Sequence, residues 1–101
     1  MPPPPLSGEA LAQATRLVTQ GERYLAQGNI AIAREYFERA ADLGLAAAAM
    51  KMAETYDPAA LAVRGALGPK PNAAEARKWY ERAMALGMHD AEAQLHRLDD
   101  R

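Results

Sequence analysis

The chain contains no cysteine and has few large apolar side chains. Its aromatic fraction is 6%, made up of one tryptophan, one phenylalanine and four tyrosines. Without cysteine, the chain forms no disulfide, offers no thiolate to a metal and has no cysteine nucleophile. This absence is compatible with a reducing and with an oxidising compartment, so the composition leaves the localisation open.

An excess of one charge and a long apolar run are also missing. The 12 Lys and Arg residues nearly balance the 13 Asp and Glu residues, for a formal net charge of −1. A nucleic-acid partner is disfavoured because no excess of positive charge is available to meet a phosphate backbone. The best apolar run, Leu45 to Met50, ends at Lys51, whereas a bilayer span needs about 20 apolar residues. We therefore expect a soluble chain without direct membrane insertion.

Proline is concentrated at the start of the chain. Residues 1–6 read MPPPPL and hold four of the seven prolines, a composition that favours an extended polyproline helix. The stretch lacks the charged and apolar regions of a signal peptide. We interpret residues 1–6 as the end of a proline-rich linker from a longer parent protein, and residues 7–101 as one domain.

Apolar residues recur along the rest of the chain with helical spacing, and no segment alternates as a half-buried β-strand does. Ser7 is a candidate N-cap, and Gly28 and Gly44 are candidate C-caps. Asp57 before Pro58 can start a further helix, as can Asn72 with its capping-box-like sequence. We expect helices over residues 7–27, 30–43, 45–56, 72–87 and 89–98, a short helical turn over 58–63 closed by Gly65, and a loop over 66–71. The predicted fold class is all-α.

The second helix shows the clearest division into an apolar and a polar face. Its expected core positions are Ile30, Ala33, Phe37, Ala40 and Ala41. The expected solvated positions are Arg34, Glu35, Glu38 and Arg39.

The chain writes nearly the same eleven letters twice. Residues 34–44 read REYFERAADLG and residues 77–87 read RKWYERAMALG, an offset of 77 − 34 = 43. Helix pairs that repeat every 30 to 45 residues are typical of solenoids, in which each pair buries its apolar face against the next. We therefore predict an α-α superhelix of two pairs, over residues 11–44 and 45–87, followed by a capping helix over 89–98.

The repeat resembles a known family. Gly21, Tyr24, Ala33, Phe37 and Ala40 fall in the tetratricopeptide register, although Leu17, Gln20 and Leu45 replace the tryptophan, leucine and proline typical there. The segment EARKWYERAMALGMHDAEAQL closely resembles the SEL-like repeat, and the long connection DPAALAVRGALGPKPN between two helices is typical of that family. The resemblance covers residues 11–98. The stretch MAETYDPAAL resembles C-terminal modules of bacterial proteins that follow proline-rich regions, which implies a cytoplasmic or periplasmic location.

The resemblance implies a concave surface on which the first helix of each pair contacts a peptide or a partner helix. Carried over to this chain, the contact residues are Thr15, Val18, Glu22, Leu25, Met50, Glu54, Asp57 and Arg97. The acidic trio Glu22, Glu54 and Asp57 would favour a partner with basic groups. The alternative is an ordinary solvated surface.

No other residue pattern predicts a catalytic or cofactor site. His89 and His96 with Glu92 could be imagined around a metal, but solvated histidines are commoner on a short terminal helix, so we expect no metal site and no cofactor. Trp79 and Tyr80 stand at core spacing, which favours packing over ligand stacking. We see no nucleophile motif and no phosphate loop, and we expect no enzyme.

The sequence therefore predicts a non-enzymatic interaction module that binds another protein. A homodimerising end module is the first alternative, and a small-ligand-binding domain is the second, although alanine-rich packing argues against a pocket. The 57–72 insert could replace the concave face as the functional surface, since Leu61, Val63 and Leu67 need to be buried somewhere.

Overall fold

The computed structural model describes residues 6–64 and 70–99, and within these residues it contains six helices and no strand. The helices are α1 (Gly8–Ala26), α2 (Ile30–Asp42), α3 (Ala46–Glu54), α4 (Pro58–Arg64), α5 (Ala73–Ala85) and α6 (Ala91–Asp99). The prediction of an all-α chain is confirmed. The predictions for the proline segment 1–5, for Gly65 and Leu67 and for the side chain of Val63 concern residues outside the described part.

The two repeated helices, α2 and α5, begin and end alike. Asn29 and Asn72 are their N-caps, and each side-chain oxygen accepts a hydrogen bond from the backbone three residues on. Both helices are followed by a glycine in the left-handed region, Gly44 at φ 107° and Gly87 at φ 108°. Residues with a Cβ rarely adopt this conformation, which explains why glycine recurs at this point of the repeat.

Two predicted caps differ in detail. Ser7 precedes α1 but its side chain makes no capping hydrogen bond. The capping box at Asn72 is only half formed, because the Asn72 backbone N–H donates to the carbonyl of Tyr56 at 2.8 Å instead of to Glu75. This bond fixes the end of the insert to the end of α3.

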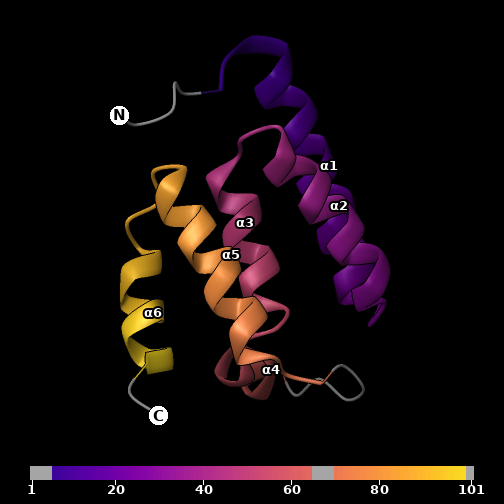
Figure 1. Cartoon of the computed structure of the whole chain (residues 1–101). Coiled ribbons are helices and arrows are strands. Elements are labelled where there is room, and N and C mark those ends of the chain that lie inside the picture. Colours follow the sequence, from indigo (N-terminus) through magenta and orange to yellow (C-terminus); the bar gives the residue numbers. More distant parts are fainter. Residues whose placement is uncertain (1–5, 65–69, 100–101) are drawn as a thin grey trace.

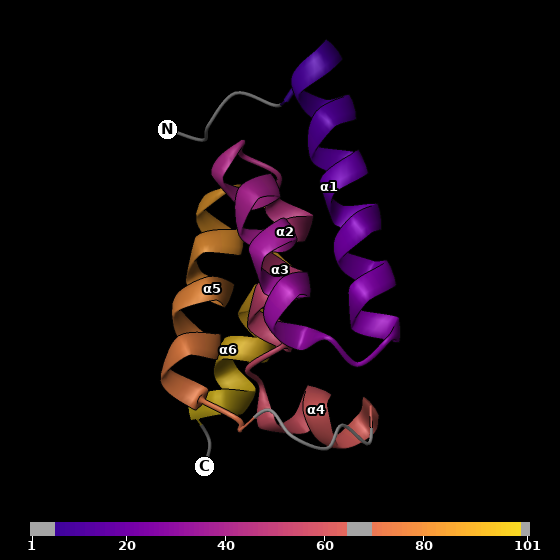
Figure 2. The same cartoon turned by 90° about the vertical axis from the view of Figure 1, so that its right-hand side faces the viewer.

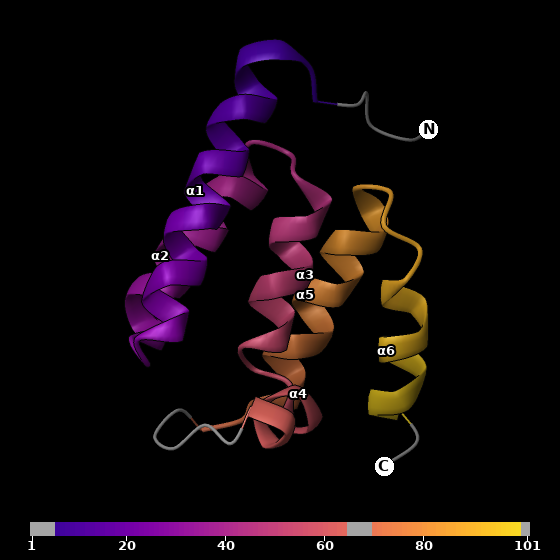
Figure 3. The ribbon, with the colours of Figure 1, turned by 180° about the vertical axis from the view of Figure 1, so that it is seen from behind.

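The helices form two layers, with α2 and α5 in one and α1, α3 and α6 in the other (Figure 1). Successive helices pack as α1 on α2, α2 on α3, α3 on α5 and α5 on α6, so the chain passes back and forth between the layers (Figure 1). Seen from behind, α1 passes in front of α2, and α3 lies in front of α5 (Figure 3). An ion pair between Glu22 and Lys51 (2.8 Å) joins α1 to α3, and one between Arg82 and Asp42 (2.8 Å) joins α5 to α2.

Short helix α4 covers one end of the second pair. It lies beyond the end of α3 and to one side of the end of α5 (Figure 2), and Leu61 is buried there with 6% of its surface exposed. The prediction that residue 61 needs burial is confirmed.

The core is built mostly from alanine, with a few large side chains between the layers. The five predicted core residues of α2 are all buried, namely Ile30, Ala33, Phe37, Ala40 and Ala41. On α5, the equivalents of Ala33, Phe37 and Ala40 are also buried, namely Ala76, Tyr80 and Ala83. In the first pair, Phe37 lies against Gly21, where a Cβ would stand 2.6 Å from the ring. Small residues therefore allow the helices to approach closely.

One residue of the predicted solvated face is placed differently. Arg34 is half-buried, its guanidinium donates to the hydroxyl of Thr55 at 2.9 Å and to the Thr55 carbonyl at 2.6 Å, and it stacks on the ring of Tyr56 at 3.8 Å. The long side chain reaches from α2 to the end of α3. The pattern of apolar and polar residues does not predict such a contact between helices.

Candidate functional site

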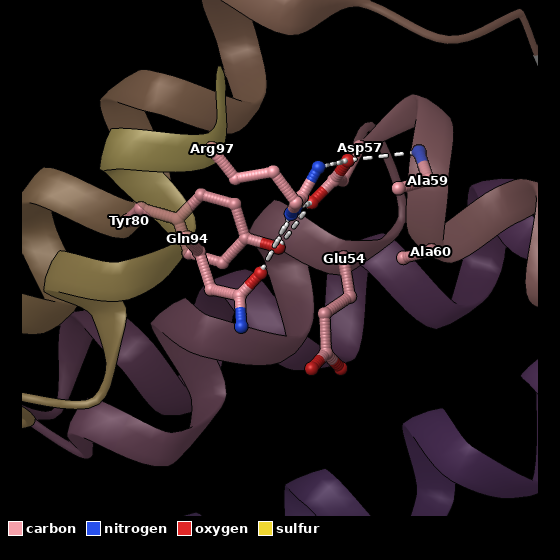
Figure 4. A pocket seen from close by; sticks show the side chains of 7 residues that line it. All are labelled: Glu54, Asp57, Ala59, Ala60, Tyr80, Gln94 and Arg97. Carbon is pink, nitrogen blue, oxygen red and sulfur yellow. Dashed lines mark hydrogen bonds and ion pairs between the residues drawn. The ribbon is translucent and has the colours of Figure 1, made fainter. Parts of the chain in front are cut away.

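A cavity of about 440 Å³ opens where α3, α4, α5 and α6 meet. Its lining residues are Glu54, Asp57, Ala59, Ala60, Tyr80, Gln94 and Arg97 (Figure 4). The volume falls in the range of about 300–1,000 Å³ that is usual for ligand sites. The alanine-rich sequence argues against a buried pocket, and the space between α4 and α6 is an open hollow beside the second pair.

Asp57 lies between α3 and α4 and belongs to the ends of both. Its backbone N–H donates to the carbonyl of Ala53 at 2.9 Å, and its side-chain oxygen Oδ1 accepts from the N–H of Ala59 at 3.0 Å. With Pro58 at the first helical position, Asp57 is the predicted cap of α4. The local sequence thus fixes the carboxylate at the base of the cavity.

The Asp57 carboxylate is fully buried and holds two further helices. The hydroxyl of Tyr80 on α5 donates to Oδ2 at 2.7 Å. The guanidinium of Arg97 on α6 forms a bidentate ion pair, with one bond to Oδ1 at 3.2 Å and a second to Oδ2. Burial opposes ionisation of Asp57, but the bonds from Arg97, Tyr80 and Ala59 outweigh it and lower its pKa.

The same contacts act on the partners of Asp57. Burial and the hydrogen bond to the carboxylate raise the pKa of Tyr80, and the hydrogen bond to Asp57 raises the pKa of Arg97. At neutral pH Asp57 is therefore a weak base and Tyr80 a weak acid, which makes both poor groups for proton transfer. The cluster links α4, α5 and α6 beside the cavity.

Gln94 completes the arrangement around Arg97. Its carbonyl oxygen accepts from Nε of Arg97 at 3.2 Å and from Nη2 at 2.9 Å. Since arginine has only donors, these bonds fix which end of the Gln94 amide faces it. The amide nitrogen of Gln94 points away from the guanidinium (Figure 4).

Glu54 is the other charged group of the cavity. Its side chain is exposed, and its carboxylate points away from Asp57 (Figure 4). Among the side chains that the structure describes, which do not include those of residues 63 and 64, none forms an ion pair or a hydrogen bond with the Glu54 carboxylate. Of the charged residues that line the cavity, Arg97 pairs with Asp57, and Glu54 is the third.

The structure brings several predicted contact residues together. Glu54, Asp57 and Arg97 line the cavity, while Leu25 and Glu54 share a small adjoining hollow with Lys51, Thr55 and Leu61. One surface therefore extends from α1 across α3 to α6.

The other predicted contact residues are less accessible or lie outside these hollows. Val18 and Met50 are half-buried against the core, and Thr15 is exposed on α1 outside both hollows. Asp57 was predicted as a third exposed acid, but none of its surface is exposed. Glu22 is exposed and paired with Lys51.

Two cavity residues were missed in the sequence. Tyr80 was assigned to packing, and it is buried as expected, but its hydroxyl also binds Asp57. The signal was the tyrosine itself, because the equivalent position of the first repeat is Phe37. Gln94 carried no signal, since a lone glutamine on a terminal helix is ordinary.

Trp79 is buried, with 5% of its surface exposed, which agrees with the packing interpretation. His96 lies 3.9 Å from Glu92 on the exposed side of α6. Among the residues that the structure describes, no three metal-ligating side chains gather. In the same residues, no helix is long and apolar enough to cross a membrane.

No protein-family model, curated protein or solved structure matches this chain. The geometry of the two layers and the cavity therefore provides the basis for a functional proposal.

Proposed function

We propose that the chain is a non-enzymatic protein-interaction module, of the SEL-like repeat type, of a larger bacterial protein. It binds a peptide or a helix of another protein on the surface formed by α1, α3 and α6. The observation that carries the proposal is the equivalence of α2 and α5, which puts the two repeated segments in one layer and leaves the first helices of the pairs for the other layer.

The equivalence extends beyond the repeated letters. Phe37 and Tyr80 are both fully buried and both followed three residues later by a buried alanine. The two helices also begin at the same kind of N-cap, an asparagine, and are followed by the same kind of residue, a glycine with positive φ. Repetition of one helix pair is the construction principle of α-solenoids, whose concave surfaces bind extended partners.

The surface of α1, α3 and α6 also has the properties of a contact surface. It combines the cavity with exposed carboxylates, Glu22 on α1 and Glu54 on α3. Half-buried Leu25 and Met50 add apolar area beside them. Anchoring hollows within a partly charged surface are typical of peptide-binding sites.

A random peptide library displayed on phage, selected on the purified chain, tests this proposal. Selected peptides are synthesised and titrated against the wild type, Glu22→Lys and Glu81→Lys. The two variants change the charge equally at exposed positions, on α1 and on α5. We expect Glu22→Lys to weaken binding and Glu81→Lys to leave it unchanged. Equal effects, or no selectable peptide, would overturn the proposal.

Sedimentation velocity over a wide concentration range is the companion measurement. A monomer at all concentrations leaves the α1, α3 and α6 surface free for a partner, as we propose. A dimer that Glu22→Lys disrupts and Glu81→Lys does not would show that the partner is a second copy, and the chain would then be a homodimerising end module.

A further inference from the structure

The Asp57 carboxylate is already occupied by hydrogen bonds within the fold. Asp57 accepts four hydrogen bonds, from Ala59, Tyr80 and twice from Arg97. These fill both carboxylate oxygens, so Asp57 has little capacity for a ligand. Its charge is matched by Arg97, which removes it as an attractive centre for a cation.

Arg97 is equally unavailable to an anionic ligand. Its Nε and Nη2 donate to Gln94, and both terminal nitrogens donate to Asp57. An anion would have to displace a buried carboxylate from a bidentate pair, and it would meet the negative charge of Glu54. The cavity is therefore not an anion site, despite the arginine in its wall.

Two polar groups of the cavity wall have no hydrogen-bond partner among the side chains that the structure describes, the amide nitrogen of Gln94 and the carboxylate of Glu54. The first can donate two hydrogen bonds, and the second can accept several and carries a negative charge. The bonds from Arg97 hold the Gln94 amide in one orientation, so its donors are fixed before a ligand arrives. A fixed donor beside a free carboxylate selects a ligand that has both a carbonyl oxygen and a cationic group.

We propose that this cavity binds a lysine or arginine residue of a partner peptide, with the cationic side chain on Glu54 and a backbone carbonyl on Gln94. This inference rests on the proposed function and names the chemistry of the partner at one position. The cavity volume of about 440 Å³ gives room for a long side chain with its flanking peptide groups.

Isotope-edited NMR titrations with small probes test the inference. The cationic probes are acetyl-arginine N-methylamide and acetyl-lysine N-methylamide. Acetyl-glutamate N-methylamide keeps the carbonyls and reverses the charge, and ethylguanidinium keeps the cation without a carbonyl. We expect saturable shifts at the Gln94 side-chain amide and the cavity backbone for the cationic amino-acid probes, weaker binding of ethylguanidinium and none of the glutamate derivative.

Glu54→Gln and Glu81→Gln form a matched pair for the same titration. Both remove one negative charge from an exposed glutamate, inside and outside the cavity. Glu54→Gln should weaken the arginine probe by about three- to tenfold, the range expected for a partly exposed ion pair, while Glu81→Gln should match the wild type. Thermal unfolding of each variant verifies that the fold is kept.

The inference is overturned if the arginine probe gives no saturable shift at the cavity, if the glutamate probe binds as well, or if Glu54→Gln binds like the wild type. Peptides selected on the whole chain separate this failure from failure of the proposed function. If they still bind the α1, α3 and α6 surface while the cavity shows no cation preference, the interaction module stands and only the ligand class is wrong.

Discussion

The two helix pairs place different aromatic residues in the same structural position. In the first pair, Phe37 lies on Gly21, and a turn at Gly28 and Asn29 joins the helices. In the second pair, Tyr80 takes the equivalent position. Along the chain, α4 comes between α3 and α5. The hydroxyl that distinguishes the two rings binds Asp57 at the start of α4.

At this position the second repeat has a buried polar cluster where the first has an apolar contact. The phenylalanine only fills space, so the first pair closes by packing alone. The tyrosine also fixes the insert, and Arg97 fixes α6 through the same carboxylate. The cavity exists because these bonds hold α4 and α6 on either side of an opening.

Removal of the Phe37 ring should have the largest effect. Phe37 is fully buried, so Phe37→Ala should lower the free energy of unfolding by about 3–5 kcal/mol. Urea unfolding followed by circular dichroism measures the change. A loss below about 1 kcal/mol would show that the first pair does not depend on this packing.

Removal of the buried carboxylate should rank second. Asp57→Ala leaves the Tyr80 hydroxyl, the Ala59 N–H and the Arg97 guanidinium without their acceptor. We expect a loss of about 2–4 kcal/mol, reduced from that of a fully buried pair because 35% of the Arg97 side chain is exposed. Native-state hydrogen exchange should show the loss concentrated in α4 and α6, with α1 and α2 least affected.

The charge of Asp57 also predicts a pH dependence. Its pKa is lowered in the folded chain, so its stabilisation is present above its unfolded pKa of about 3.9 and is lost as the pH falls through the folded pKa. The difference in unfolding free energy between the wild type and Asp57→Asn should be constant from pH 7 to about pH 5 and shrink below about pH 4. A difference that does not change down to pH 2 would mean that the carboxylate charge contributes nothing.

Exchange of the two aromatic rings sharpens the comparison. Tyr80→Phe removes the hydrogen bond to Asp57 and should cost about 1–2 kcal/mol, with the remaining bonds from Arg97 limiting the loss. Phe37→Tyr adds a hydroxyl where the first pair is packed closely and should also cost about 1–3 kcal/mol. If either exchange were neutral in urea unfolding, the two positions would be interchangeable and the comparison wrong.

Truncation of the neighbouring ring should have the smallest effect. Tyr36 is half-buried and stacks on Tyr24 with ring centroids 5.5 Å apart. Tyr36→Ala should lower the free energy of unfolding by about 1 kcal/mol, the size of one aromatic pair at a partly exposed position. A loss equal to that of Phe37→Ala would place the wrong face of α2 in the core.

The helices and the core could be predicted because their signals are local. Helical spacing of apolar residues, the cap at Asn72 and the C-cap at Gly44 predict α2 and α5 within a few residues, and each expected core position of α2 is buried. Residues of these types have few other stable placements in a helix pair.

The cavity could not be predicted, because it depends on residues far apart in the chain. Asp57, Tyr80 and Arg97 meet only after α4 and α6 have packed on the second pair. The family resemblance places Asp57 on the concave contact surface. Its burial requires two partners, and the sequence does not show which donors reach it.

The most direct test of the account is NMR mapping of a peptide selected on the chain. Backbone amide shifts on saturation locate the contact surface without any substitution. We predict that the largest shifts fall on α1, α3 and α6, with the cavity residues Glu54 and Gln94 among them. Shifts concentrated on α2 and α5, with none at the cavity, would contradict the proposal that the first helices of the pairs form the binding surface.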